Sequence, residues 1–296
     1  INPDLIVVGN AVSRGNKELE YALNNKIRIF SMSEFVSRFF IKNKTSIVVT
    51  GTHGKTTTSS LIAHLLITAQ KSTGFFIGGA PGNYPFGCLI PESPNHDHQY
   101  FVTEGDEYDT AYFDKRSKFF HYRPDIAVIN NVEFDHADIF NDVEEIKKSF
   151  RLFARLIPGN GRIILNGDDP IAMEVVEDAW TPKITLGFNS SNQCIISNLT
   201  SNETHTTFSL TFPNSVCTSF HLPMHGLHNV RNAAAAILVA DECGCSNIEI
   251  QNGLSTFLLP KRRMQTIGTY KQALIIDDFA HHPTAIKETI KGLRSK

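Results

Sequence analysis

Over the first 180 residues, short apolar runs alternate with segments that have helical spacing. Runs such as DLIVVG and SIVVTG are uninterrupted and short, which is typical of strands buried on both faces. The predicted strands begin at residues 4, 46, 100, 125 and 161, and the predicted helices occupy residues 16–25, 56–70 and 144–156. This order predicts an α/β fold in which a mostly parallel sheet is covered by helices on both faces.

The pattern changes near Lys183, where short segments rich in Thr, Ser, Phe and Ile replace the longer units. Residues 184–188, 194–200, 204–212 and 217–222 have this composition. We expect them to form a small antiparallel β insertion. The remaining pattern predicts helices at residues 227–242 and 248–258, a strand pair within 265–280 and a helix over 281–293.

Composition excludes several classes of protein. The 296 residues carry 28 Lys and Arg against 30 Asp and Glu, so no excess of positive charge favours nucleic acid or a membrane surface. There is no apolar run of 18 residues, so we expect no membrane span. Five cysteines without a CxxC pair argue against a disulfide framework or a structural zinc site, and favour the cytoplasm.

The stretch TGTHGKTTT, at residues 50–58, stands between a predicted strand and a predicted helix. Such a turn points backbone N–H groups toward an anion, and Gly51 and Gly54 allow a phosphate to approach closely. Lys55 can neutralise phosphate oxygens, and the Thr56 hydroxyl can ligate Mg²⁺. The loop is shorter than the usual G-x-x-x-x-G-K-[ST], because Val49 stands where the first Gly would be. A helix start that happens to contain a Lys is the alternative.

Polar side chains also follow the next two predicted strands. Glu104 ends one strand, and His136 follows the other within NNVEFDH. The carboxyl ends of parallel strands form the ligand crevice, so this pair is a candidate for divalent-ion binding. For Asp109, in the same acidic loop as Glu104, we favour a solvated surface position.

Three later segments contain further candidates for nucleotide contacts. In GLHNVRN, the side chains of His228, Asn229 and Asn232 can contact an adenine edge, although Asn229 could instead cap the following helix. Arg263 is a candidate for contact with the γ-phosphate of a nucleotide; the alternative is an ordinary basic residue on the surface. Asp278 ends a strand, where a carboxylate can bind ribose hydroxyls.

Taken together, these motifs resemble the Mur ligase family, the ATP-dependent amide-forming enzymes of peptidoglycan metabolism. The motifs GTHGKTTT, TEGDEYD, NNVEFDH, GLHNVRNAAAA, KRRMQ and DDFAHHP occur in this order and cover nearly the whole chain. The resemblance also implies that the shorter G-x-x-G-K-T loop is a genuine nucleotide loop. It implies a P-loop ATPase-type sheet with partial Rossmann-like pieces at both ends.

The resemblance implies a role for each candidate. Lys55, Glu104, His136 and Arg263 would be catalytic, with Thr56 and Glu104 on a first Mg²⁺ and His136 on a second. ATP would contact Gly51, Thr52, His53, Gly54, Lys55, Thr56, Thr57, His228, Asn229, Asn232, Arg263 and Asp278. Several branches of the family carry a carbamylated lysine about one helix after the DH motif, where a rough alignment places Phe150 in this chain.

Within the family, residues 9–23 and 104–125 resemble one branch. Its members join UDP-N-acetylmuramate to the tripeptide L-alanyl-γ-D-glutamyl-meso-diaminopimelate through an acyl phosphate, in peptidoglycan recycling. A related branch adds L-alanine instead. The only segment of this sequence that distinguishes the two branches is DKRSKF. Its basic residues either hold substrate anions or form a solvated loop; they are Lys115, Arg116 and Lys118. A P-loop kinase or NTPase, and a non-catalytic carbohydrate or nucleotide binder, are the alternatives of other classes.

The resemblance also implies a domain order. Residues 1–42 would be the tail of a UDP-binding domain, 43–267 the ATP-binding domain and 268–296 the start of a C-terminal ligase domain. The chain begins Ile-Asn-Pro and ends soon after a first βα unit, so we expect both ends to be cut from something longer. We expect these 296 residues alone to bind Mg-ATP weakly and not to ligate.

Overall fold

A ten-stranded sheet dominates the computed structural model, which describes residues 3–91, 99–134, 140, 142–202 and 204–294. Across the sheet the strands are β14 (Cys217–Leu222), β13 (Thr206–Thr211), β12 (Cys194–Ser201), β11 (Lys183–Gly187), β10 (Arg162–Asn166), β9 (Ile126–Ile129), β3 (Thr45–Thr50), β6 (Gln99–Gly105), β4 (Ser72–Phe76) and β5 (Cys88–Leu89). The strands from β4 to β12 in this order all pair in parallel, whereas β5, β13 and β14 are antiparallel to their neighbours.

The predicted strands and the mostly parallel sheet are confirmed, but the predicted start of the antiparallel insertion is wrong. β11 and β12 pair in parallel and continue the main sheet, and only β13 and β14 reverse direction. The cause is α5 (Pro170–Val175), a six-residue helix that Asp169 caps and that connects β10 to β11. A helix this short leaves no periodic signal, so the β10–α5–β11 crossover was not predicted.

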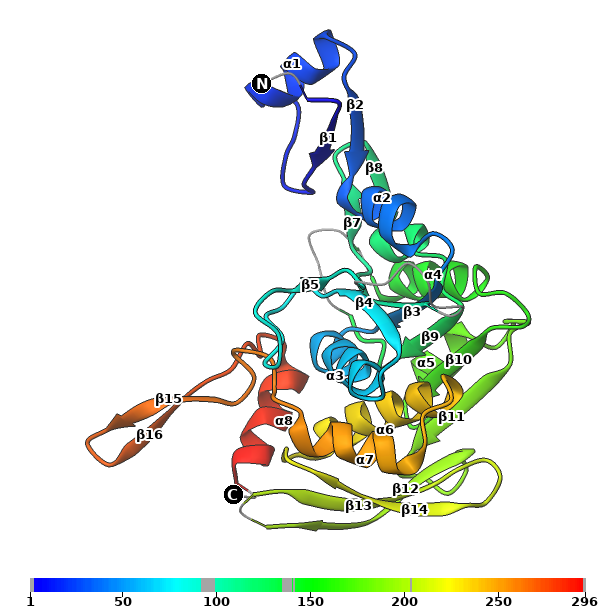
Figure 1. The fold of residues 1–296 in the computed structure, drawn as a ribbon, viewed down its shortest axis with the longest axis vertical. Helices are drawn as coiled ribbons and strands as arrows, with labels where there is room; N and C mark the ends of the chain where they lie inside the picture. Colours follow the sequence, from blue (N-terminus) through cyan, green and yellow to red (C-terminus); the bar gives the residue numbers. More distant parts are fainter. Residues whose placement is uncertain (1–2, 92–98, 135–139, 141, 203, 295–296) are drawn as a thin grey trace.

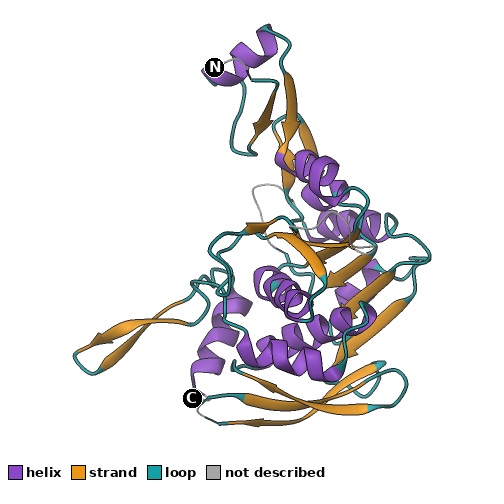
Figure 2. Ribbon diagram, viewed as in Figure 1, coloured by secondary structure: helices purple, strands orange, loops and turns teal. Residues whose placement is uncertain are grey.

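Helices cover both faces of the sheet and create two hydrophobic cores (Figures 1 and 2). On one face lie α3 (Lys55–Thr68), α6 (Leu227–Glu242) and α7 (Asn247–Thr256). On the other lie α2 (Met32–Val36), α4 (Val143–Ala154) and α5. Within β3, Ile47 and Val49 enter the first core and Val48 the second, because successive side chains of a strand point to opposite faces.

Helix α3 is buried along nearly its whole length and has no polar face, unlike the amphipathic α4. Its contacts with α6, α7 and β6 surround it. Its N-cap is Gly54, which offers no side chain to cap the first N–H groups. The first turn of α3 is therefore fixed in position while its N–H groups remain available to a ligand.

Smaller units lie outside the main sheet (Figure 1). β1 (Leu5–Val8) and β2 (Arg28–Ser31) pair in parallel around α1 (Lys17–Asn24), and a π-helical turn (Ser37–Ile41) follows α2. β7 (Asp109–Ala111) and β8 (Asp114–Ser117) form a short hairpin before a 3-10 turn (Lys118–His121). β15 (Gln265–Tyr270) and β16 (Ala273–Asp277) form a projecting hairpin before α8 (Pro283–Arg294). Among the described helices, none combines the length and apolar character needed to cross a bilayer.

Candidate functional site

Three neighbouring strands end at one edge of the sheet and carry the main candidate residues. β3 lies between β9 and β6, so the loop at residues 51–54 is flanked by Asn130 and Asn131 on one side and by Glu104 on the other. Glu104 and the loop thus lie at the same edge of the sheet, because β3 and β6 pair in parallel.

The loop is held in place by the two asparagines that follow β9. The backbone carbonyl of Asn131 accepts from the N–H of Thr52 at 3.1 Å, and its side-chain oxygen accepts from the N–H of His53 at 2.8 Å. The amide of Asn130 donates to the His53 carbonyl at 3.3 Å and to the Thr58 hydroxyl at 3.1 Å. These bonds fix the loop without using the N–H groups of the first turn of α3.

Two glycines give the loop its shape. Gly51 and Gly54 have φ values of +129° and +81°, a region that favours glycine. A Cβ on Gly54 would lie 2.6 Å from Oδ1 of Asn232 and 2.9 Å from Nδ2 of Asn130. The loop therefore packs tightly between α6 and the end of β9.

Replacing Gly54 with alanine is expected to lower the free energy of unfolding by about 1–3 kcal/mol, because it adds both a clash and a strained φ. Nucleotide affinity should fall with it. Denaturant unfolding and nucleotide titration measure the two effects. The matched control is Gly159→Ala, where a Cβ would meet nothing within 4 Å. Equal stability of the two variants would contradict this account of the loop.

Lys55, the first residue of α3, has acidic and carbonyl partners. Its Nζ donates to the Gly51 carbonyl at 2.8 Å and to Oε2 of Glu107 at 2.8 Å, with Asp106 at 4.0 Å. Burial by itself would lower the pKa of Lys55, but Glu107, Asp106 and Glu104 outweigh it and raise the pKa above its usual value. The ammonium group is therefore charged and already directed at the loop.

Glu104 and Thr56 form the candidate cation site. The Thr56 hydroxyl donates to Oε2 of Glu104 at 3.2 Å, and the N–H of Gly78 donates to Oε1 at 3.0 Å. Burial, and next the Asp106 carboxylate, raise the pKa of Glu104 to about 7, although Lys55 and Thr56 act in the opposite direction. The raised pKa shows that the negative charge of Glu104 is not fully compensated by its neighbours. A bound cation would supply the missing positive charge, so the site fits a cation. His136, the predicted second ligand, lies outside the described residues.

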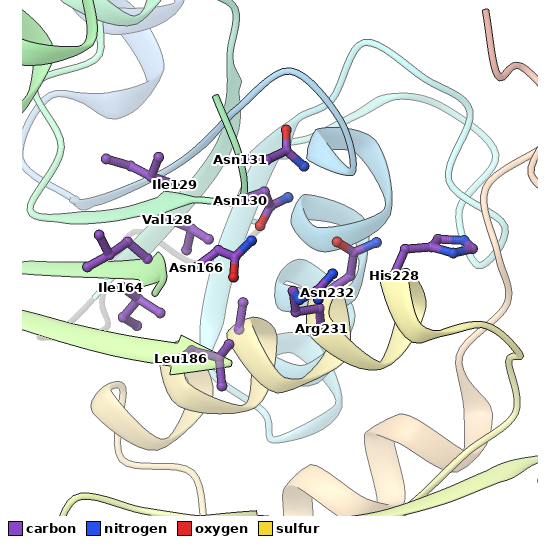
Figure 3. A pocket seen from close by; sticks show the side chains of 12 residues that line it. Val128, Ile129, Asn130, Asn131, Ile164, Asn166, Leu186, His228, Arg231 and Asn232 are labelled. Atoms are coloured by element: carbon purple, nitrogen blue, oxygen red, sulfur yellow. The ribbon is translucent and has the colours of Figure 1, made fainter. Parts of the chain in front are cut away.

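A small cavity lies between the ends of β9, β10 and β11 and helix α6. Its volume is about 50 Å³. Figure 3 shows Asn130, directly after β9, and Asn166, the last residue of β10, with Arg231 and Asn232 projecting toward them from α6. His228 lies one turn earlier and points away from the strands. Among the described residues, Nε of Arg231 and Nδ1 of His228 are buried and have no hydrogen-bond partner. Both atoms are therefore available to a ligand.

Asn229 is placed differently from its neighbours. It lies inside α6, whose N-cap is Gly226, so the alternative that Asn229 caps this helix is wrong. Its side chain is buried and donates to the His225 carbonyl at 2.8 Å. Thr57, also predicted to contact the nucleotide, is buried in the first turn of α3.

Arg263 and Asp278 approach the site from the C-terminal segment. Oδ2 of Asp278 accepts from the N–H of Met264 at 2.8 Å, which fixes the turn that carries Arg263. The Arg263 guanidinium lies 5.4 Å from the ring centre of Phe279. Burial lowers the pKa of Arg263, whereas Asp278 and Glu104 raise it, so this arginine is within electrostatic range of the candidate cation site.

The basic residues of DKRSKF all have acidic neighbours. Lys115 pairs with Asp109 at 2.5 Å, Arg116 with Asp114 at 2.6 Å and Lys118 with Asp106 at 3.1 Å. Asp109 is thus paired on a hairpin, and Lys115 and Arg116 remain largely exposed. Phe150 belongs to α4 and is buried in the second core, where its ring packs against Phe119.

Several residues of the site were not predicted from the sequence. Asn130, which binds the loop, lies in the quoted NNVEFDH, and its position directly after a strand was the available signal. Glu107 lies in the same acidic loop as Glu104 and Asp109, and nothing in TEGDEYD sets it apart from those carboxylates. Arg231 has no distinguishing sequence signal beyond its place in GLHNVRN.

Comparison with known families identifies this arrangement. Residues 49–240 match the model of the Mur ligase middle domain, and residues 262–296 match the model described as Mur ligase, glutamate ligase domain. The first match alone spans more than half of the chain. The chain belongs to the Mur ligase family.

Individual relatives give a finer comparison. The chain is 36% identical over 295 residues to the UDP-N-acetylmuramate–L-alanyl-γ-D-glutamyl-meso-2,6-diaminoheptandioate ligase of Haemophilus influenzae, covering 99% of this chain and 63% of that protein. It is 33% identical over 298 residues to the UDP-N-acetylmuramate–L-alanine ligase of Acetivibrio thermocellus, covering 99% of this chain and 60% of that protein. A crystal structure of a murein peptide ligase from Psychrobacter arcticus matches with a TM-score of 0.82 and 36% identity, over 99% of this chain and 63% of that one. The chain thus spans less than two thirds of the length of these relatives.

Proposed function

We propose that the loop at residues 51–54 and the first turn of α3 bind the phosphates of ATP. The observation that carries this proposal is the placement of Lys55, Thr56 and Glu104 around the uncapped start of a buried helix. Free N–H groups, a charged lysine and a carboxylate near a hydroxyl are the groups that a magnesium-bound polyphosphate needs. The other residues proposed to contact ATP in this loop and turn are Gly51, Thr52, His53, Gly54 and Thr57.

Thr56 and Glu104 would hold a Mg²⁺ ion, which would offset charge on the transferred phosphoryl group. Their oxygen atoms suit Mg²⁺, which keeps several waters and shares substrate phosphates. We propose His136 as a ligand of a second ion, as the resemblance to the family implies. Mg²⁺ and ATP together are the proposed cofactors.

The adenosine part of ATP would lie toward α6 and the C-terminal segment. Asn232 borders the nucleotide loop at Gly54, and Nδ1 of His228, one turn earlier on α6, is available for a hydrogen bond. Asn229 was predicted to contact the adenine, but because its side chain donates to the His225 carbonyl, we propose instead that it positions the backbone of this turn. Asp278 is proposed as a ribose ligand. Arg263 is proposed to contact the phosphate in transfer, because Glu104 lies within its electrostatic range.

The proposed reaction forms an amide in two steps. A carboxylate oxygen of the first substrate attacks the γ-phosphorus, the bond to the β,γ-bridging oxygen breaks, and ADP leaves. The amine nitrogen of the second substrate then attacks the acyl phosphate carbonyl, which releases phosphate and a proton. The proposed catalytic residues would act by charge stabilisation and positioning, so no covalent enzyme intermediate is needed. These residues are Lys55, Glu104, His136 and Arg263.

For the substrates, we propose UDP-N-acetylmuramate and the tripeptide L-alanyl-γ-D-glutamyl-meso-diaminopimelate. The 36% identity to a relative with that named activity, over 99% of the chain, supports this choice. Relatives named as L-alanine ligases, at 33% identity, support the second candidate. We place the protein in peptidoglycan recycling in the cytoplasm, where its five free thiols would stay reduced.

The test follows ADP release by the full polypeptide that carries these residues, with UDP-N-acetylmuramate and Mg-ATP present. Release that requires the tripeptide and ignores L-alanine is the expected result. Release that requires L-alanine would establish the second candidate. Release indifferent to both amines would point to a P-loop kinase or NTPase and overturn the ligase proposal.

We also propose a division of the chain for this function. Residues 1–42 would belong to a UDP-binding domain, 43–267 to the ATP-binding domain and 268–296 to a C-terminal ligase domain. On this division, the 296 residues alone should bind Mg-ATP weakly and form no amide. The partners would be small molecules, with no nucleic acid or membrane involved.

A further inference from the structure

Two histidines and a glutamate from three separate segments meet beside the nucleotide loop. His53 belongs to that loop, Glu133 follows β9, and His282 precedes α8. One donor atom from each residue lies within 4.8 Å of the other two. The three side chains are 17%, 31% and 18% exposed, so the cluster is partly buried and still open to ions from solvent.

The spacing of the three donor atoms matches that around a small tetrahedral ion. Nε2 of His53 lies 3.1 Å from Nδ1 of His282, and Oε2 of Glu133 lies 3.8 Å from the first nitrogen and 3.6 Å from the second. Ligands at about 2.1 Å from a tetrahedral metal are about 3.4 Å apart. The side chains are therefore close to ligating positions without rearrangement.

The surrounding hydrogen bonds orient His282 as they orient a metal ligand. Its Nε2 lies 3.3 Å from the carbonyl oxygen of Phe134, which can only accept, so Nε2 carries the proton. The N–H of Thr284 approaches Nδ1 at 3.3 Å, which also requires a lone pair there. A backbone carbonyl that fixes the tautomer of a histidine is the usual support for a metal-bound imidazole.

Glu133 is held in a similar way. The Thr284 hydroxyl donates to its Oε2 at 2.7 Å, and its backbone N–H donates to the Thr52 hydroxyl at 2.8 Å. The carboxylate is therefore directed at the two imidazoles by both neighbouring segments. A negative charge held there favours a cation between the rings.

We propose that His53, Glu133 and His282 form a binding site for a divalent transition metal of the zinc class. Two imidazoles and one carboxylate leave a fourth position open, as in three-ligand zinc sites. Nitrogen-rich ligands favour such an ion over Mg²⁺, so this site is chemically distinct from the oxygen site at Thr56 and Glu104. The bound ion would join the start of α8 to the nucleotide loop.

The experiment titrates the protein with Co²⁺, a zinc-like probe whose tetrahedral complexes absorb visible light, in excess Mg²⁺. Saturable binding with a tetrahedral spectrum is expected, and Zn²⁺ should displace the probe. His282→Ala and Glu133→Gln should each weaken binding by about tenfold or more. The matched control is His281→Ala, because the ring of that neighbour lies against Phe279 and outside the cluster. Glu104→Gln should leave Co²⁺ affinity unchanged, since it alters only the other site.

A second readout does not depend on the spectrum. Metal binding should slow amide hydrogen exchange in α8 of the unsubstituted protein and of His281→Ala, but not of His282→Ala. The proposal is overturned if Co²⁺ does not bind saturably, or if Glu104→Gln weakens binding while His282→Ala and Glu133→Gln do not. Glu133→Gln, which preserves side-chain volume, keeps the test valid if His282→Ala fails to fold.

Discussion

Replacing Lys55 with alanine is expected to reduce amine-dependent ADP release by the full polypeptide by about 10³-fold. The Lys55 ammonium lies at the start of α3 and keeps its charge despite burial, so its loss removes charge stabilisation from a site with little water to replace it. Steady-state assays at saturating Mg-ATP measure the change. The matched control is Lys71→Ala, because that lysine lies just beyond the other end of the same helix and donates to the Gly244 carbonyl.

A loss of stability must be separated from a loss of function in this variant. Lys55 is the close cation of the buried Glu107, so Lys55→Ala alone is expected to lower the free energy of unfolding as well. Adding Glu107→Gln removes the carboxylate's charge and should restore stability without restoring turnover. If the double variant regains turnover, Lys55 acts only through the fold, and its proposed role is wrong.

Replacing Glu104 with glutamine is expected to abolish Mg²⁺-dependent turnover and to stabilise the protein above pH 7. The folded pKa of about 7 exceeds the usual value of 4.5, so the folded state binds more protons than the unfolded state between these pH values. Stability therefore falls as pH rises from 4.5 to 7, and the loss is complete above 7. We expect this loss to be about 2 kcal/mol, allowing for partial exposure of the side chain.

Urea unfolding at pH 5 and pH 8 in the absence of Mg²⁺ tests this prediction. Glu104→Gln should exceed the unsubstituted protein in stability at pH 8 and differ little at pH 5. The control Glu177→Gln alters an exposed glutamate beyond α5 and should change neither value. A stability advantage that is the same at both pH values would show that ionisation of Glu104 is not its source. Affinity for Mg-ATP is also expected to fall as pH drops through 7, because protonation of Glu104 would remove the proposed Mg²⁺ ligand.

The parts of the fold that were predictable are those in which one physical signal dominates. Strands such as β3 are buried on both faces, so their apolar runs are unbroken, and α3 follows a turn that needs glycine. The grouping of Glu104 with the loop followed from parallel strands ending at one edge. Each of these inferences depends on neighbours in sequence or on a general rule of sheet geometry.

The parts that were not predictable depend on distant segments. The Lys55–Glu107 contact requires the order β3–β6 and the direction in which the acidic loop turns after β6, and neither is encoded in TEGDEYD. The hydrogen bonds from Asn130 depend in the same way on β9 lying next to β3. The cluster of His53 and His282 joins residues 229 positions apart, which no local pattern specifies.

The Glu107 carboxylate has a consequence for how nucleotides are exchanged. It lies 2.8 Å from the Lys55 ammonium, the group that is proposed to bind a phosphate oxygen of the nucleotide. Because the fold holds the Glu107 carboxylate there, this internal anion would compete with nucleotide phosphate for Lys55. Its effective concentration is high and does not fall when the protein is diluted. On the proposed function, ATP, which presents more phosphate oxygens than ADP, would displace the carboxylate more readily. After transfer of the terminal phosphoryl group, Glu107 would pair with Lys55 again and so speed the departure of ADP.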